Sequence, residues 1–367
     1  MDKLQEARKI ISEVDAQMAE LFVRRMRAAE QVAEYKRERG LPIFDGAREK
    51  EVLEKGSARV EDPVLREHYV RFLQSSMDVS KDYQRRILEG MKVAYSGSEG
   101  AFANLAAQGI FPSAQLIGYP NFTEAYASVE NGESDCAVLP IENSSAGEVG
   151  QVTDMMFSGS LCVNGVYELA VRHDLLALEG AQMRDITTVV SHPQALAQCE
   201  PYIRKKGWQT REHTNTALAA KLVSESGDKT LAAIASEKTA ALYGLEVLEE
   251  NIHQSGSNTT RFAVFSRTEN ETLGKDLSDH FILLFTTGNK AGSLAKAIEI
   301  IGRHGFNMRT LRSRPRKDLL WEYYFYAELS GNARSDAGKA MLDELAAVCE
   351  RVRVAGTFRA HCRIGEE

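Results

Sequence analysis

Residues 4–35 read LQEARKIISEVDAQMAELFVRRMRAAEQVAEY, a stretch that contains neither glycine nor proline. Apolar residues recur through it at helical spacing, and Gly40 followed by Pro42 supplies a stop. The stretch therefore predicts one long helix at the start of the chain. At 1.5 Å per residue, a helix of about 36 residues spans about 54 Å.

Two shorter helices are predicted to follow, over residues 45–55 and 62–88. Asp62 suits the N-cap of the second, because Pro63 then takes the first helical position. Neither helix is long enough to cover the first one. The all-helical part, residues 1–90, is therefore predicted to form an intertwined homodimer or a higher homo-oligomer.

After residue 90 the pattern changes to short β-rich runs that alternate with helices, which is typical of an α/β sheet domain over residues 91–267. The polar segment 267–279 has the composition of a linker. Residues 278–362 then read strand, helix, strand, strand, helix, strand, the βαββαβ order of a ferredoxin-like α+β unit. The chain of 367 residues is thus predicted to hold three domains.

The composition, with 43% hydrophobic and 26% charged residues, is that of a folded globular protein. A net charge of −7 gives no overall attraction to nucleic acid or to an anionic membrane. The first ten residues, MDKLQEARKI, lack the features of a signal peptide, so we expect a cytoplasmic protein. Five cysteines without a CxxC pair predict reduced thiols, and we expect neither a metal nor a cofactor.

Three cations interrupt the apolar stripe of the first helix: Arg8, Arg25 and Lys36. Long cationic side chains often lie along apolar surface, so snorkelling or structural ion pairs are an alternative. The stripe offers only Asp15 as a counter-charge, and because an unpaired buried cation is costly, the pattern favours a ligand with more than one carboxylate. Arg25 and Lys36 lie three turns apart on one face and can lean toward a common point. Arg8 is too far away and would serve the site of the other chain.

A hydroxyl and an amide lie in the apolar stripe of the third predicted helix, at Ser80 and Gln84. Buried polar groups need partners, which either a core network or the same ligand would supply. Together with the cations, these residues resemble the all-helical chorismate mutase family over residues 1–90. The matching set is Arg8, Arg25, Lys36, Asp45, Arg48, Glu49, Ser80 and Gln84.

This resemblance implies a role for each residue. Arg25, and Arg8 of the partner subunit, would hold the two carboxylates of chorismate, and Lys36 and Gln84 would donate to its ether oxygen. A Claisen rearrangement needs no acid, base or nucleophile, so catalysis consists of holding a reactive conformer and stabilising negative charge on the breaking ether oxygen. Glu49 and the Asp45 region would contact the ring hydroxyl. Arg48 and Ser80 would complete the pocket.

Polar segments of the α/β part mostly follow predicted strands, on the side where open α/β sheets bind ligands. Ser191, followed by Pro193 at a helix start, presents backbone N–H groups suited to a carboxylate. The segment SGSEGAFA at 96–103 has neither the GK[ST] of a phosphate loop nor the GxGxxG of a dinucleotide site. Each cluster by itself also fits ordinary turn and cap chemistry.

Three motifs together resemble prephenate dehydratase over residues 91–266: PIENSSAG at 140–147, SHPQALAQC at 191–199 and NTTRF at 258–262. The family implies a two-lobed α/β domain like that of periplasmic binding proteins. Thr260 would donate a proton or hydrogen bond to the departing hydroxyl of prephenate as carbon dioxide leaves. Because aromaticity of the product drives the reaction, a weak donor suffices. The residues that would bind or orient prephenate are Glu142, Asn143, Ser191, Gln198 and Arg261.

The C-terminal part resembles an ACT regulatory domain, through GNKAGSLAKAIEII at 288–301 and LRSRP at 311–315. In this family the domain binds L-phenylalanine, so feedback inhibition of the enzyme is expected; the alternative is an ACT domain that only dimerises. Arg312 replaces a glutamate that members with feedback control carry, which reverses a charge where the amino group of the effector would be recognised. The residues implied in effector binding are Gly292, Ser293, Leu294, Ser313, Arg314 and Pro315.

The sequence therefore predicts a bifunctional enzyme of phenylalanine biosynthesis, an isomerase and a lyase, that converts chorismate to prephenate and then to phenylpyruvate. A non-catalytic amino-acid sensor is the competing hypothesis, because a two-lobed cleft beside an ACT domain also suits a binding protein. A sensor has no need of the hydroxyl of Thr260 or of cations on the helical stripe. A mutase half reduced to a dimerisation arm is a third possibility, which the intact set of polar residues on the helices disfavours.

Overall fold

A computed structural model describes residues 3–253, 258–270, 279–317 and 319–365 of the chain. The chain divides into two compact units, Met1–Met91 and Lys92–Glu367. The predicted linker at 267–279 falls largely on residues 271–278, which lie outside the described residues, as does residue 278, where the third domain was predicted to begin. No helix among the described residues is both long enough and apolar enough to cross a membrane.

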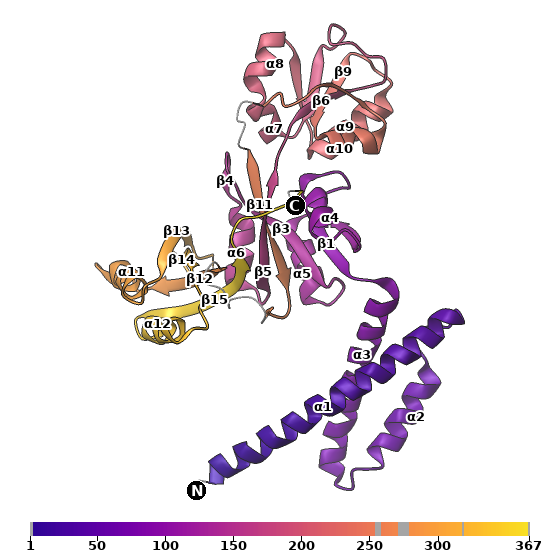
Figure 1. Ribbon diagram of the computed structural model, residues 1–367, viewed down its shortest axis with the longest axis vertical. Coiled ribbons are helices and arrows are strands. Elements are labelled where there is room, and N and C mark those ends of the chain that lie inside the picture. Colours follow the sequence, from indigo (N-terminus) through magenta and orange to yellow (C-terminus); the bar gives the residue numbers. More distant parts are fainter. Residues whose placement is uncertain (1–2, 254–257, 271–278, 318, 366–367) are drawn as a thin grey trace. The chain divides into compact units, whose positions relative to one another are not determined.

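The described part of the first unit folds into three helices, α1 (Lys3–Glu38), α2 (Gly46–Ser57) and α3 (Pro63–Glu89) (Figure 1). Asp62 caps α3 as predicted, because its carboxylate accepts a hydrogen bond from the backbone N–H of Val64 at 2.8 Å. The long first helix and the two shorter ones are therefore confirmed.

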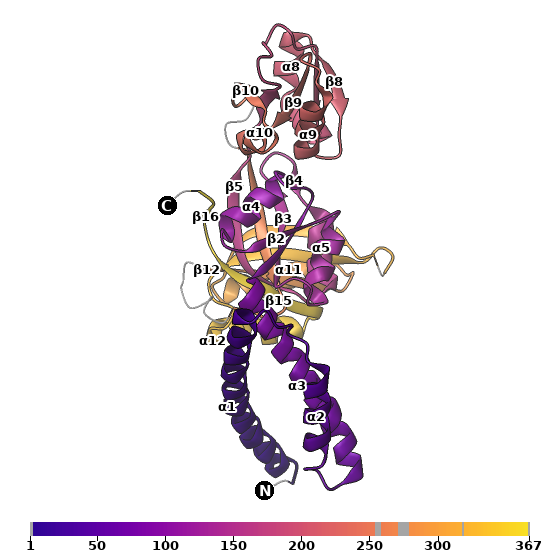
Figure 2. The ribbon, with the colours of Figure 1, turned by 90° about the vertical axis from the view of Figure 1, so that its right-hand side faces the viewer.

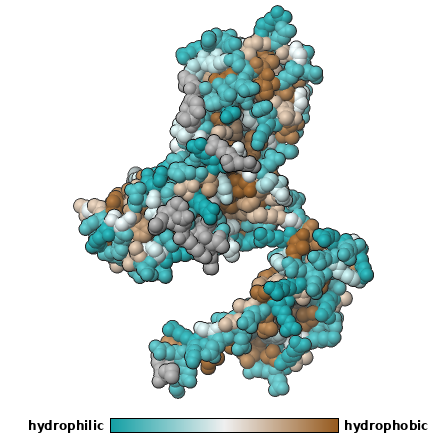
Figure 3. Space-filling view, viewed as in Figure 1, coloured by the Kyte–Doolittle hydropathy of each residue, from teal (hydrophilic) through white to brown (hydrophobic). Residues whose placement is uncertain are grey.

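Most of α1 has no covering layer within the unit. Its buried residues are Met26, Ala29 and Ala33, all in the second half of the helix, where α3 packs against it. In the first half, apolar side chains such as Ile11 are exposed, with 58% of that residue accessible. Figure 3 shows apolar residues on the surface of this helical unit.

The described strands of the second unit form two sheets. One end of the larger sheet belongs to a mixed α/β lobe, which is the first lobe of this unit. The strands of this lobe lie in the order β5-β11-β3-β1-β2, with β4 paired to β3. Their bounds are β1 (Lys92–Ser96), β2 (Gln115–Tyr119), β3 (Cys136–Asn143), β4 (Gly147–Glu148), β5 (Cys162–Ala170) and β11 (Thr259–Ser266). The helices of the lobe are α4 (Phe102–Ile110), α5 (Phe122–Glu130) and α6 (Gly150–Ser158).

The second sheet belongs to a second lobe, which the chain enters after β5 and leaves before β11 (Figures 1 and 2). Its strand order is β10-β6-β9-β7-β8. The strands are β6 (Asp174–Ala177), β7 (Thr188–Ser191), β8 (Gln209–Glu212), β9 (Leu231–Ala235) and β10 (Glu246–Glu249). The helices are α7 (Pro193–Gln198), α8 (Glu200–Lys206), α9 (Thr216–Ser226) and α10 (Glu237–Tyr243).

One helix predicted in this lobe, over residues 193–207, is broken in two. The break falls at Cys199, which ends α7 and precedes α8. Pro201 explains it, because proline has no N–H to continue the helical hydrogen bonds and disfavours helical geometry in the residue before it.

The C-terminal elements extend the first sheet in the order β13-β14-β12-β15, with β15 next to β5. In chain order they are β12 (Asp279–Thr287), α11 (Ser293–Arg303), β13 (Asn307–Pro315), β14 (Tyr323–Ser330), α12 (Asp336–Ala346), β15 (Cys349–Arg359) and β16 (Cys362–Arg363). The helix predicted over 333–349 is shorter than expected, because Ser335 caps its start and β15 begins at Cys349.

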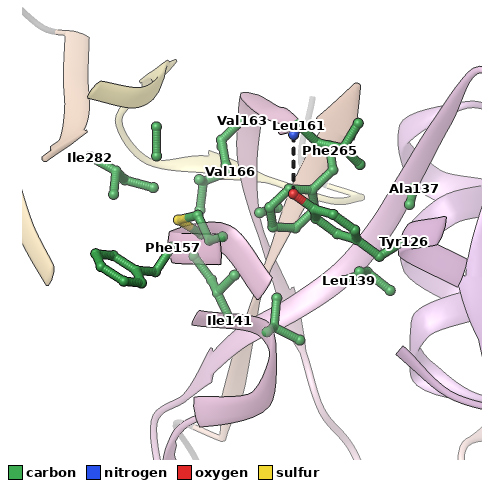
Figure 4. Packing of buried hydrophobic residues seen from close by; sticks show 14 of the residues in the cluster. Tyr126, Ala137, Leu139, Ile141, Phe157, Leu161, Val163, Val166, Phe265 and Ile282 are labelled. Carbon is green, nitrogen blue, oxygen red and sulfur yellow. Dashed lines mark hydrogen bonds between the residues drawn. The ribbon is translucent and has the colours of Figure 1, made fainter. Parts of the chain in front are cut away.

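The first lobe and the C-terminal strands share one apolar core. Figure 4 shows part of it, with Tyr126 beside Phe265 and with Ile282 of β12 on the other side. The Tyr126 hydroxyl accepts a hydrogen bond from the backbone N–H of Leu161 at 3.1 Å. Because the core is continuous, the position of the C-terminal sheet is tied to the lobe that carries β3 and β11.

Candidate active sites

The helical unit contains a pocket of about 380 Å³ between α1, α2 and α3. Seven of the eight residues predicted for the first site line it: Arg25, Lys36, Asp45, Arg48, Glu49, Ser80 and Gln84. Arg8 does not; it is exposed in the first half of α1. The three helices thus bring together side chains that are as far as 59 positions apart in the sequence (84 − 25).

Two cations in this pocket are held by neutral oxygens. Arg25 donates to the backbone carbonyl of Ser76 at 2.9 Å and contacts the Ser80 hydroxyl, and Lys36 donates to the carbonyl of Ile43. Among the described residues, no carboxylate forms an ion pair with either cation. Burial lowers the pKa of Arg25 because the charged form is desolvated. The pocket therefore offers two positive charges to an anionic ligand.

The acidic residues of the pocket are already engaged. Glu49 pairs with Lys81 at 2.9 Å, and the Asp45 carboxylate caps α2 by accepting from the N–H of Arg48 at 3.0 Å. Arg48 itself pairs with Glu51 at 2.6 Å. Lys81 also lines the pocket and was missed by the sequence analysis, although it directly follows Ser80 in α3.

Gln84 is buried, and its Oε1 atom has no hydrogen-bond partner in the described part of the chain. An unsatisfied buried acceptor costs about 1–3 kcal/mol. Since Gln84 lines the pocket, a bound ligand or water is the natural partner for its amide.

The second unit holds a cleft of about 400 Å³ whose lining comes from both α/β lobes. The first lobe and its connecting strands contribute Asn143 and Thr260, and the second contributes Gln198. Asn143 and Thr260 face each other across the β3–β11 pair. The cleft thus brings together three of the six residues predicted for the second site.

A directed hydrogen-bond network fixes the Thr260 hydroxyl. The Asn143 amide donates through Nδ2 to Thr260 Oγ1 at 2.9 Å and to Asn258 Oδ1 at 2.9 Å. Its Oδ1 is held in turn by the backbone N–H groups of Ser145 and Ala146. Because Thr260 accepts from the amide, its own proton is left to donate, and no described residue accepts it.

The network continues to a histidine that the sequence analysis did not select. Gln198 Oε1 accepts from Asn258 at 3.0 Å and lies 2.7 Å from His173 Nε2, which places the imidazole proton on Nε2. His173 Nδ1 is buried without a partner among the described residues. Desolvation lowers the pKa of His173 to about 4, so the ring is neutral near pH 7. Its position just after β5 was the signal available in the sequence.

Comparisons with known proteins identify a family for the helical unit and for the two-lobed part of the second unit. The family model of chorismate mutase type II matches residues 7–85, and that of prephenate dehydratase matches residues 93–270. A bifunctional chorismate mutase/prephenate dehydratase from Enterobacter agglomerans is 31% identical, over 95% of this chain and 94% of its own. The chain belongs to the bifunctional chorismate mutase/prephenate dehydratase family.

Two solved structures resemble a large part of this chain. A protein described as GqqA, a novel type of quorum quenching acylase, has a TM-score of 0.68 and 30% identity, over 73% of this chain and 98% of its own. The prephenate dehydratase of Arthrobacter aurescens, in complex with L-Phe, has a TM-score of 0.67 and 26% identity, over 73% of this chain and 90% of its own.

Three other residues predicted for the dehydratase site do not line the cleft. Ser191 is fully buried and donates to the carbonyl of Ile234 at 2.5 Å, so its hydroxyl is used within the second lobe. Glu142 and Arg261 precede and follow the cleft residues on β3 and β11, and therefore point to the opposite face of the sheet. There they pair with each other at 3.1 Å, which does not fit direct contact with prephenate.

The residues expected to bind an effector divide between two faces. Gly292 precedes α11 with a φ of +83°, a conformation that favours glycine, and Ser293 begins that helix. On β13, Ser313 and Pro315 are exposed, whereas Arg314 points the other way and pairs with Asp154 at 2.8 Å. Arg314 and Ser313 therefore point to opposite faces of β13, so their side chains do not line the same pocket.

Proposed function

We propose that the chain rearranges chorismate to prephenate in its helical pocket and converts prephenate to phenylpyruvate in the two-lobed cleft. Membership of a family with both activities supports the assignment. The observation that carries it is the state of the polar groups. Within the described part of the chain, Arg25 and Lys36 have no carboxylate partner, and nothing accepts the proton of Thr260.

In the mutase pocket, Arg25 would bind a carboxylate of chorismate while Lys36 and Gln84 face the ether oxygen. The reaction breaks one C–O bond and forms one C–C bond without proton transfer. Fixed charges that stabilise the transition state and hold the reactive conformer are therefore sufficient. The Lys81–Glu49 pair holds the acidic side of the pocket toward the ring hydroxyl.

In the dehydratase cleft, the electron pair of the bond to the ring carboxylate moves into the ring as carbon dioxide leaves. The ring hydroxyl departs from the opposite carbon and takes a proton, which makes water and an aromatic product. Thr260 would donate the proton or a hydrogen bond to that hydroxyl. The hydrogen bond from the Asn143 amide to the Thr260 oxygen supports this role, because it leaves the Thr260 proton to donate. Gln198, which accepts hydrogen bonds from Asn258 and His173, would form part of the cleft wall that the second lobe contributes.

We further propose the three-domain division predicted from the sequence, at 1–90, 91–267 and 278–362. The third part has the strand order β13-β14-β12-β15, that is 2-3-1-4 in its own numbering, which supports a ferredoxin-like ACT domain. A similar dehydratase structure contains L-Phe, which supports phenylalanine as the effector of this chain. Gly292, Ser293, Leu294, Ser313 and Pro315 remain the proposed contacts.

The exposed first half of α1 supports a homodimer in which this helix packs on a second copy. Arg8 lies in that half, outside the pocket of its own chain, so it is proposed to reach the pocket of the partner. The cytoplasmic location stays a prediction.

The decisive experiment supplies purified protein with chorismate and follows prephenate and phenylpyruvate, with and without L-phenylalanine. The proposal requires both products in sequence, and less phenylpyruvate when phenylalanine is added. Binding of phenylalanine with no consumption of chorismate or prephenate would instead establish the amino-acid sensor.

A further inference from the structure

Four charged side chains behind the cleft contact one another in an open series, which we name the ion-pair series: Arg312, Glu142, Arg261 and Glu328. Glu142 contacts Arg312 of β13 through Oε1. Its Oε2 lies 3.1 Å from the guanidinium of Arg261 of β11. Arg261 also pairs with Glu328 of β14 at 2.9 Å. Since β13 and β14 are neighbours, the ion-pair series joins two strands of the C-terminal sheet to two strands of the first lobe.

Two members of the ion-pair series, Glu142 and Arg261, lie directly behind the groups that we assign to the dehydratase reaction. Arg261 pairs across the strands with Glu142, and the adjacent pair is Thr260 with Asn143. Because successive residues of a strand point to opposite faces, Glu142 and Arg261 each share a peptide unit with a cleft residue on the other side, Asn143 and Thr260 respectively. A shift of Glu142 or Arg261 therefore changes the contact between Asn143 and Thr260.

The side chains of the ion-pair series are shielded enough from solvent for their charges to interact strongly. The exposed fractions of the side chains are 24% for both Arg312 and Glu142 and 5% for Glu328. The Arg312 guanidinium also lies over the ring of Tyr326, 5.7 Å from its centroid, and within 3.8 Å of Glu148. A negative side chain at position 312 would face Glu142 and Glu148 and repel both.

We propose that Arg312 is a positioning residue of the dehydratase: through Glu142 it holds β3 and β11 in the arrangement that places the Asn143 amide on the Thr260 hydroxyl. This role rests on the function proposed above. The sequence singles out Arg312 only as the residue that replaces a glutamate of members with feedback control; in the structure its side chain points to the first lobe and not to a free face of β13.

The test compares Arg312→Gln, Glu142→Gln and the double variant with the unaltered protein. Either single change breaks the same contact, so we expect each to lower the dehydratase kcat about tenfold with little change in KM, and the double variant to lose no more than the larger single effect. Arg312→Glu adds repulsion and should lower kcat about 100-fold. Arg312→Lys keeps the charge and should recover part of the loss.

Two controls separate positioning from general damage. Lys339→Glu makes the same change of charge on the exposed surface of α12 and should leave both activities unchanged. Mutase activity, which we assign to the helical unit, should be unchanged in every variant of the ion-pair series. In a Thr260→Ala background, Arg312→Gln should have no further effect on the residual dehydratase rate, because the group that it positions is gone.

The result that overturns the role of Arg312 is a normal dehydratase rate in folded Arg312→Gln and Arg312→Glu protein, or single effects that multiply in the double variant. If Arg312→Glu does not fold, the milder glutamine cycle still decides the question. Failure of the unaltered protein to consume prephenate would refute the proposed function itself, which is a separate outcome.

Discussion

Thr260→Val is the most direct test of the dehydratase assignment, because valine keeps the shape of threonine and removes only the hydroxyl. A positioned proton or hydrogen-bond donor typically contributes 10²–10⁴-fold to a rate, or about 2.7–5.4 kcal/mol at about 1.36 kcal/mol per factor of ten. We therefore expect the dehydratase kcat to fall by about that factor. Thr260→Ser, which keeps the hydroxyl, should retain most of the activity.

Loss of stability does not account for such a fall. In Thr260→Val the Asn143 amide loses one acceptor at 2.9 Å but keeps Asn258 Oδ1 at 2.9 Å. The expected cost is about 1 kcal/mol, against the 5–15 kcal/mol that is typical of folded domains.

The assay supplies chorismate and measures both products, so that mutase turnover reports on the same sample. Prephenate should accumulate at the normal rate while phenylpyruvate formation nearly stops. A valine variant that forms phenylpyruvate at more than about a third of the normal rate would show that Thr260 is not the donor, since the smallest expected effect is about 100-fold.

Three further changes test other parts of the structure. Arg25→Ala removes a cation that, as far as the structure describes the chain, only neutral oxygens hold, and should reduce mutase kcat/KM by at least about 100-fold while added prephenate is still consumed; equal loss of both activities in folded protein would contradict separate sites. Ile11→Glu places a charge on the exposed apolar half of α1. Sedimentation analysis should then show monomers, and their mutase activity should be weak. An unchanged association state would argue against the dimer. His173 has a folded-state pKa of about 4, below the unfolded value of about 6.5, so the unfolded state binds the proton more tightly and stability falls as the pH drops below about 6.5. Between pH 8 and pH 5 this group alone should cost about 2 kcal/mol of unfolding free energy in urea titrations, and His173→Gln should show a drop smaller by that amount; an identical drop in both proteins would contradict the low pKa.

Local signals explain which parts of the fold were predictable. The cap at Asp62 and the stop after residue 38 depend on a few neighbouring residues, so the three helices of the first unit followed from the sequence. The break at Cys199 was missed although Pro201 marks it, because apolar spacing was continued through the proline. The early start of β15 depends on pairing with β12, a contact between distant segments.

The sites divide in the same way. Spacing along α1 placed Arg25 and Lys36 at one pocket, whereas the residues that accept from the Nδ2 group of Asn143 are 115 or more positions away in the chain, beyond the range of local patterns. The placement of Glu142 and Arg261 was within reach of the sequence. Two consecutive residues of one strand point to opposite faces of the sheet. If Asn143 and Thr260 face the cleft, Glu142 and Arg261 must therefore point away from it.

The junction between β15 and β5 limits how the chain can be divided. Gly356 pairs with Val163 so closely that a Cβ at this position would overlap the backbone of β5, and β16 continues the pairing along that strand. Truncation before β12 would strip these partners from β5 and open an unprotected edge that invites aggregation. The C-terminal segment is therefore not a detachable module, and attempts to exchange it between relatives would have to carry a new neighbour for β5.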